Sequence, residues 1–148
     1  MLKAKVIKNF DLSKIKLDLH RELNQGIDFI ADDISEGIDK GAQFGKRFEA
    51  LKRETADRKG HSQPLIEDGI LRDAGRMQRG KATPAKQEAT LLPAPEREQI
   101  SFWHNTGAKP NPKREHWGIS TRADNKIDKL IDKKIRKAID RSRRASIA

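Results

Sequence analysis

Cysteine and tyrosine are both absent from this 148-residue sequence. Without cysteine the chain can form neither disulfides nor thiolate metal sites, so it needs no oxidising compartment. No apolar run approaches the ~20 residues that a helix needs to cross a bilayer, and residues 1–10 lack the apolar stretch of a signal peptide. We therefore expect a protein that is soluble and intracellular when made, without membrane contact.

Apolar residues are scarce as well. They make up 34% of the sequence and charged residues 36%, whereas the usual shares are about 45–50% and about 25%. The length suits a single domain, but this composition can bury only a modest core. Either parts of the chain are extended, or neighbouring subunits complete the core.

The net charge of +10 is unevenly spread. Residues 11–41 hold eight acids and four bases, a net charge of −4, and residues 42–148 hold 14 acids and 25 bases, a net charge of +11. Opposite charges in two segments favour head-to-tail association of copies. The basic majority also attracts polyanions such as DNA, and composition does not choose between these two partners.

Residues with an obvious catalytic or metal-binding arrangement are lacking. None of the four histidines stands in the spacing of a zinc hydrolase, and no nucleophile elbow, phosphate-binding loop or dinucleotide fingerprint occurs. His104 and His116 can approach each other across a proline loop, but no third or fourth metal ligand is evident. The adjacent carboxylates Glu67 and Asp68 indicate a solvated face. We expect no enzyme activity, no cofactor and no metal.

Two long helices are predicted. The first covers residues 13–40, where apolar residues recur at spacings of 3 and 4: Ile15, Leu19, Leu23, Ile27, Ile30, Ile34 and Ile38. Gly26 and Gly37 weaken this helix by roughly 1 kcal/mol each relative to alanine, and Gly41 ends it. Its stripe packs either on the protein's own sheet or on a neighbouring subunit.

The second long helix covers residues 121–144, with Ser120 or Thr121 as its cap. Its apolar stripe is Ile127, Leu130, Ile131, Ile135, Ala138 and Ile139, and its last turns are crowded with lysine and arginine. That basic end is expected to face DNA or an acidic partner. The residues concerned are Arg136, Lys137, Arg141, Arg143 and Arg144.

Shorter elements lie between the two helices. Residues 44–59 form a basic amphipathic segment, and residues 87–92 are predicted to pair with residues 78–83 as a hairpin. Residues 96–106 form a short helix that ends at Gly107, followed by a proline-containing loop over residues 108–119.

The fold class is therefore predicted as α+β, with a small antiparallel sheet flanked by a long N-terminal helix and a C-terminal helix. A single domain, 1–148, contains an N-terminal strand or arm (1–12), the long helix (13–41), an α+β core with extended loops (42–119), and the C-terminal helix with its basic tail (120–148).

Three segments of the chain carry a resemblance. The first runs from Pro64 to Arg76 (PLIEDGILRDAGR), the second from Phe102 to Gly107 (FWHNTG), and the third from Pro112 to Ser120 (PKREHWGIS). In their order and spacing, over residues 44–140, they resemble the phage virion-morphogenesis or tail-completion family, which includes neck and minor tail proteins. The third segment departs from the family in having His116 and Trp117 before Gly118.

The resemblance implies a structural role. It implies a non-enzymatic subunit of the head–tail connection of a tailed bacteriophage, located in the virion after assembly in the host cytoplasm. The expected partners are copies of the chain in a hexameric or dodecameric ring, other connector, neck, tail-terminator or tail-tube proteins, and transiently the passing DNA. The expected interface residues are Ile27, Ile30, Ile34, Ile38, Leu71, Arg72, Trp103, His104, Arg114 and Trp117.

An alternative function is a stand-alone basic nucleic-acid-binding protein. Its aromatic residues, among them Phe102, Trp103 and Trp117, would then stack on bases. The competing interpretation is that these aromatics are core anchors in a chain that has few of them. A small hydrolase or nuclease is a third and weaker hypothesis, because no clustered carboxylates are evident.

Overall fold

The computed structural model describes residues 16–147, and side chains as far as Arg144. The predicted N-terminal strand or arm (1–12) and the first residues of the predicted long helix (13–15) lie outside the described residues. The fold is α+β, as predicted. Its helices are α2 (His20–Lys40), α3 (Arg53–Lys59), α4 (Glu98–Thr106) and α5 (Thr121–Ile147), with the short 3-10 helices η2 (Ala74–Arg76) and η3 (Pro95–Arg97).

The strands form two separate antiparallel pairs within the described part of the chain, not one sheet. The pairs are β1 (Ala42–Gln43) with β2 (Lys46–Arg47), and β3 (Gln78–Gly80) with β4 (Thr90–Leu92). The β3–β4 pair confirms the predicted hairpin. Both pairs are short, so the helices and connecting loops supply most of the packing.

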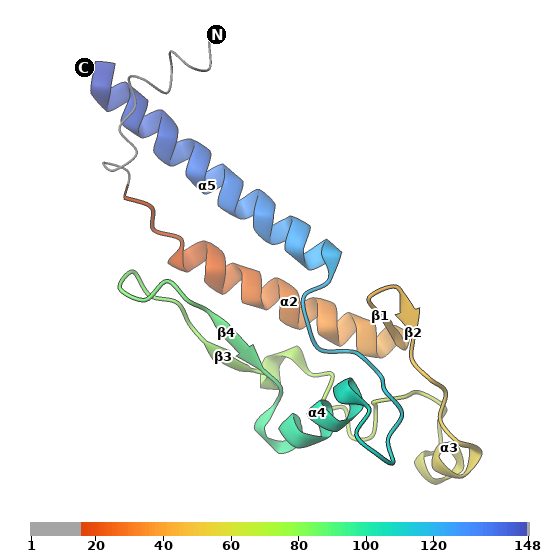
Figure 1. The fold of residues 1–148 in the computed structure, drawn as a ribbon. Coiled ribbons are helices and arrows are strands. Elements are labelled where there is room, and N and C mark those ends of the chain that lie inside the picture. Colours follow the sequence, from red (N-terminus) through yellow and green to blue (C-terminus); the bar gives the residue numbers. More distant parts are fainter. Residues whose placement is uncertain (1–15, 148) are drawn as a thin grey trace.

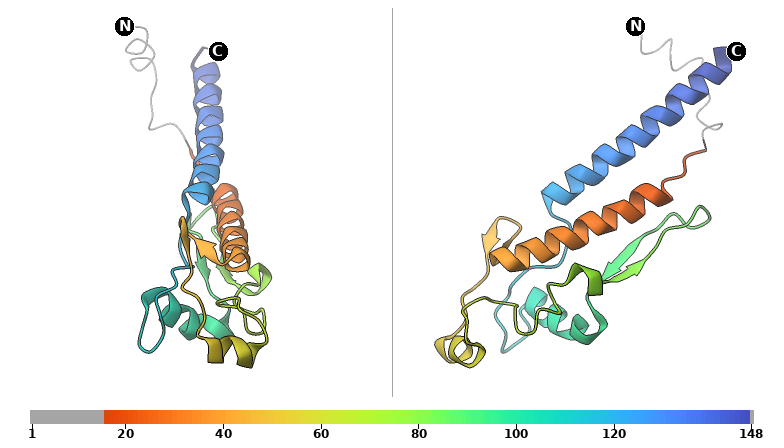
Figure 2. Two further views of the ribbon diagram at one scale, coloured as in Figure 1. Left: turned by 90° about the vertical axis from the view of Figure 1, so that its right-hand side faces the viewer. Right: turned by 180° about the vertical axis from the view of Figure 1, so that it is seen from behind.

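Helix α2 lies in the middle of the molecule (Figure 1). Helix α5 runs along one side of it in the opposite direction, and the β3–β4 hairpin, α4 and the connecting loops lie along the other side. The views in Figure 2 show the same arrangement, with α5 extending past the N-terminal end of α2. Two elements that are distant in sequence thus cover opposite sides of one central helix.

The central helix begins later than the sequence predicts. The apolar stripe favours a start at residue 13, but the four described residues before His20 are not helical. The side chain of Gln87 accepts a hydrogen bond from the amide of Leu19 (2.7 Å) and donates one to the carbonyl of Leu17 (3.1 Å). These contacts satisfy backbone groups that a longer helix would pair internally. A tertiary contact therefore overrides the helical pattern.

A tight turn follows the end of α2. Gly41 adopts a left-handed conformation (φ 68°), and its amide bonds back to the last turn, so the predicted stop is confirmed. The β1–β2 hairpin then turns through Phe44 (φ 53°) and Gly45 (φ 73°), both left-handed as in a type I′ turn. Only Phe48 of the two nearby phenylalanines packs against the core. Of the predicted amphipathic segment 44–59, only the part from Arg53 to Lys59 is helical.

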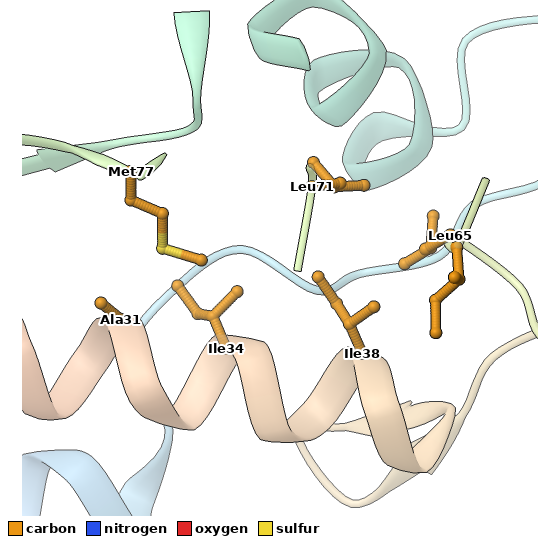
Figure 3. Packing of buried hydrophobic residues seen from close by; sticks show 7 residues of the cluster. Ala31, Ile34, Ile38, Leu65, Leu71 and Met77 are labelled. Carbon is orange, nitrogen blue, oxygen red and sulfur yellow. The ribbon is translucent and has the colours of Figure 1, made fainter. Parts of the chain in front are cut away.

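The hydrophobic core lies between α2 and the segment that follows α3 (Figure 3). Its buried members are Ala31, Ile34, Ile38, Leu65, Ile66, Leu71 and Met77. Each large aliphatic side chain buried in this way contributes roughly 1.5–3 kcal/mol. Trp117 is partly buried against the same cluster.

The enclosure of these side chains corrects part of the expected subunit interface. Ile34 and Ile38 each keep 1% of their surface exposed, so a neighbouring copy cannot reach them. The same holds for Ile27 and Leu71, which are also buried, and Ile30 is packed partly against the same core. From Ile27 to Ile38 the stripe of α2 is covered mainly by the protein's own chain, by the segment that follows α3 and not by the expected sheet. Leu19, Leu23 and Ile30 are half-buried.

The β3–β4 hairpin is anchored to α2 by one amide side chain. Asn24 donates to the carbonyl of Ala82 (3.0 Å) and accepts from the amide of the same residue (2.7 Å). This reciprocal pair matches the bonding that a neighbouring strand would offer. The segment that leads away from β3 is therefore held against the helix and does not extend freely.

Helix α5 is attached to α2 at several points along its first half. Its first turn is capped by Ser120, whose hydroxyl accepts from the amide of Ala123 (3.1 Å), as predicted. Gly26 of α2 lies against Ile127, so close that an added Cβ would stand 3.2 Å from Ile127 Cγ1. Lys134 forms an ion pair with Glu22. The glycine that weakens α2 locally therefore permits close helix packing.

Candidate functional site

A buried polar cluster joins α4 to the proline loop. We call Ser101, Asn105, Arg114 and His116 the polar centre. Ser101 Oγ lies 2.8 Å from His116 Nε2, and His116 Nδ1 lies 2.9 Å from the carbonyl oxygen of Arg114. The side chain of Asn105 accepts from the backbone amides of His116 and Trp117, both at 3.0 Å. The loop is thereby held against the helix by side chains.

The hydrogen bonds of His116 determine its tautomer. A carbonyl oxygen can only accept, so Nδ1 carries the proton and Nε2 accepts from the Ser101 hydroxyl. Burial lowers the pKa of His116 and keeps the ring neutral. The geometry resembles a nucleophile and its base, but the side chain of His116 is 0% exposed. A substrate cannot reach this pair, which therefore positions the loop.

Arg114 is enclosed with the polar centre and not displayed to solvent. Its guanidinium donates to the carbonyl oxygens of Glu49 (2.8 Å) and Ala50 (3.3 Å), and its amide donates to the carbonyl of His104 (2.7 Å). Burial lowers its pKa. The expectation that Arg114 lies at a subunit interface is corrected here: it ties three segments of one chain together.

His104 lies beside the polar centre in an environment that does not satisfy its ring. It is half-buried, and within the described part of the chain its Nδ1 is enclosed without a hydrogen-bond partner. Burial, with Arg114, His116 and Lys59 nearby, lowers its pKa to about 4. A buried unsatisfied nitrogen costs roughly 1–3 kcal/mol, so this histidine is a local weakness of the fold.

The other expected interface residues are scattered. Arg72 is exposed and pairs with Asp39 (2.7 Å). Trp103 on α4 is 40% exposed, whereas Trp117 lies against the core. Of the expected set, Arg72 and Trp103 are thus the residues that a partner can reach most readily.

Several exposed apolar side chains were missing from the expected set. Phe102 is 60% exposed and Ile119 is 58% exposed, and Phe44 and Leu92 are exposed as well. Phe102 lies next to the expected residue Trp103 in the predicted short helix, and it was considered only as a base-stacking or core residue. The position of Phe44 depends on its left-handed turn, which its residue type does not favour.

The acidic residues of α2 are largely paired within the chain. Arg122 donates to Asp33 and Glu36 across the two long helices, which lowers the pKa of Glu36 to about 2. Asp28 pairs with Arg79. Glu22 pairs with Lys134, and Asp39 pairs with Arg72. Little of the acidity of α2 is therefore free for a neighbouring copy.

Helix α5, in contrast to α2, carries exposed charged side chains that have no ion-pair partner in the described chain. We call Lys129, Lys133, Arg136, Lys137 and Arg144 the basic face of α5. All five are exposed, and none takes part in an ion pair with another residue that the structure describes. At 100° per residue they fall within a sector of about 100°, opposite the apolar stripe. Asp140 is the one acidic residue in this sector.

The predicted basic residues of α5 therefore divide into two groups. Arg136, Lys137 and Arg144 belong to the basic face. Arg141 is exposed but lies at the edge of it, and Arg143 is exposed and has an interaction of its own. The earlier turns of the helix contribute Lys129 and Lys133. The sequence prediction did not include them, because it considered the last turns alone.

No group of three or more potential metal ligands occurs among residues 16–144. Over the described residues, no helix has the length and apolar character to span a membrane. Comparisons with known protein families, curated proteins and solved structures find no match for this chain.

Proposed function

We propose that this protein is a non-enzymatic structural subunit of the head–tail connection of a tailed bacteriophage. It acts by assembling into a ring with copies of itself and by docking onto neighbouring proteins of the connection. The resemblance of its three sequence segments to the tail-completion family supplies the identity of the particle. The incomplete cover of α5 supplies the physical reason for assembly.

One observation carries this proposal. All six residues of the apolar stripe of α5 are only half-buried, and Ala123 alone is buried among the described side chains of that helix. Helix α5 packs on α2 and extends past the end of it (Figure 2). An apolar stripe of this length is normally covered on a helix of a folded protein. A neighbouring subunit would complete that cover.

The three resembling segments also meet in the folded chain. Trp117 of the third segment packs against the core cluster that contains Leu65, Ile66 and Leu71 of the first segment. Ser101 of α4 bonds to His116 of the third segment, and Asn105 of the second segment bonds to the same loop. Segments that form one packed unit are more informative than three isolated matches, because their spacing then has a structural cause.

The exposed apolar residues of α4 support docking to a further partner. Phe102 and Trp103 are adjacent on that helix, and they are 60% and 40% exposed. Large exposed aromatic side chains commonly anchor protein interfaces. We assign this side of the subunit to contact with another protein of the connection.

Native mass spectrometry of the full chain tests the proposal. We expect one closed oligomer, as a hexamer or dodecamer, either for the chain alone or after addition of the adjoining connector proteins. A chain that stays monomeric under both conditions would contradict the proposal. The stand-alone nucleic-acid-binding alternative predicts that monomer, together with tight and salt-sensitive binding of DNA or RNA.

A further inference from the structure

The basic face of α5 is the largest concentration of charge that the described chain leaves unpaired. From Lys129 to Arg144 it runs along about 22 Å of helix, at a rise of 1.5 Å per residue. Its five positive charges are exposed to solvent, and Asp140 is the one acid in their sector. Such a face holds a positive potential that attracts polyanions.

Helix α2 of a second copy offers little free acidity to match the basic face. Four carboxylates of α2 are already paired with a base of the same chain. Lysine pairs with Glu22, and arginine pairs with Asp28, Glu36 and Asp39. Asp33 is paired with Arg122 and is also buried. To use these acids, a neighbouring copy would have to break existing ion pairs. Helix α2 of a neighbouring copy is therefore a poor complement of the basic face, and a polyanion outside the chain is a better one.

Regularly spaced phosphates fit this face. Lys129, Lys133 and Lys137 follow one another at intervals of four residues, about 6 Å along the helix axis. Duplex DNA presents about one negative charge per 1.7 Å of its own axis. A straight row of lysine and arginine side chains can therefore contact several phosphates at once.

We propose that the basic face of α5 binds the phosphate backbone of double-stranded DNA without regard to sequence. This inference goes beyond the structural role proposed above and does not require ring formation. Lysine and arginine on one helix face make salt-dependent contacts with phosphates, which position a protein on DNA without reading bases. In a ring, the same face on each copy would line the path of the DNA.

Two matched variants of the full chain test this assignment. One carries K129Q, K133Q, R136Q and K137Q on the basic face. The other carries K46Q, R47Q, K52Q and K81Q, which are exposed bases of other elements. Both remove three lysines and one arginine, so the net charge of the two variants is equal. The probes are a fluorescent random-sequence DNA duplex and a fluorescent polyglutamate of equal charge, read by anisotropy across a salt series.

We expect the basic-face variant to bind the duplex about tenfold more weakly, or worse, and the control less than about threefold more weakly. Because each lost phosphate contact removes about 0.9 from the slope of log affinity against log salt, the slope should fall by about 3–4 in the basic-face variant alone. Circular dichroism should show unchanged helicity, since glutamine is a good helix former.

Other results would overturn the inference. Equal losses in both variants would show that only net charge matters. Binding of polyglutamate as tight as that of the duplex would assign the face to an acidic protein. Native mass spectrometry of the basic-face variant keeps the two proposals apart, because we expect its oligomer to match that of the unmodified chain whichever way the binding result falls.

Discussion

The two long helices of this protein differ in how their surfaces are covered. Helix α2 is packed on both sides and buries seven residues, two of them glycines that allow close approach. Helix α5 is longer, yet a single described side chain of it is buried. Charge follows the same division, because most acids of α2 are paired and the basic face of α5 is not.

This difference separates the source of stability from the surfaces available to partners. Side chains on α2 make the core, and their contribution belongs to a single chain. Side chains on α5 retain apolar area and charge that other molecules can still cover. Mutations should therefore change folding when placed on α2 and change association when placed on α5.

The largest effect is expected in the core side of α2. Ile34→Ala or Ile38→Ala should lower the free energy of unfolding by about 2–5 kcal/mol, because each leaves a cavity in an enclosed site. Ile131→Ala on α5 is the control, with less than half that loss because its side chain is only half-buried. Urea denaturation of the three variants measures this. Equal losses at Ile34 and Ile131 would remove the distinction between the helices.

The two glycines of α2 sharpen the comparison. At Gly37, an added Cβ would stand 2.1 Å from the side-chain oxygen of Gln43 and 3.1 Å from the carbonyl oxygen of Ala42. Gln43 also donates to the buried Asp33 (3.1 Å), so it cannot withdraw without losing that bond. We expect Gly37→Ala to cost about 1–3 kcal/mol, in the range of overpacked sites.

Gly26→Ala is the matched change on the side that faces α5. Its Cβ would stand 3.2 Å from Cγ1 of Ile127, so that side chain must shift by a few tenths of an ångström. Against this cost, alanine gains up to about 1 kcal/mol of helix propensity over glycine. The two contributions should nearly cancel. Thermal unfolding of both variants checks the order, and a larger loss at Gly26 than at Gly37 would show that the α2–α5 contact is the tighter one.

Regular elements with local signals were predictable from the sequence. The stop at Gly41, the β3–β4 hairpin, the helix that ends at Gly107 and the cap at Ser120 are confirmed, because each depends on residues close together in the chain. The fold class followed from these elements. Local chemistry was therefore sufficient for the outline of the fold.

The parts that were missed depend on contacts between distant residues. Gln87 ends the helical stripe at Leu19 from 68 positions away. The left-handed Phe44 has a residue type that gives no sign of such a turn. The bond between Ser101 and His116 joins two elements whose residue types suggested neither a network nor its burial. In each case the deciding partner was supplied by the tertiary fold, so no local pattern could reveal it.

Lowering the pH should reduce the free energy of unfolding in two separate ranges, one due to His104 and one due to Glu36. The pKa of His104 is about 6.5 in an unfolded chain and about 4 in the folded chain. The unfolded state therefore binds more protons between pH 6.5 and pH 4, and the free energy of unfolding falls as the pH falls through that range. Glu36 behaves differently: with a folded pKa of about 2, its contribution is lost only between about pH 4.5 and 2.

Thermal unfolding from pH 8 to pH 3 measures both ranges. We expect His104→Phe to reduce the decline between pH 6.5 and pH 4 by a moderate amount, leaving the part due to the buried His116. If His104→Phe retained the whole decline, the burial of His104 would not be its source.

The smallest effect on stability, and the clearest effect on association, is expected where α5 extends past α2. Ile135→Asn with Ile139→Asn should lower the free energy of unfolding less than Ile34→Ala or Ile38→Ala does, because both side chains are only half-buried in the protomer. If a neighbouring subunit covers this stripe, the same pair should abolish the oligomer, since a buried interface does not accept two unpaired amide side chains. Urea denaturation combined with native mass spectrometry separates the two effects. An intact oligomer would move the subunit contact elsewhere, and a large loss of stability would mean that this stripe already packs inside the protomer.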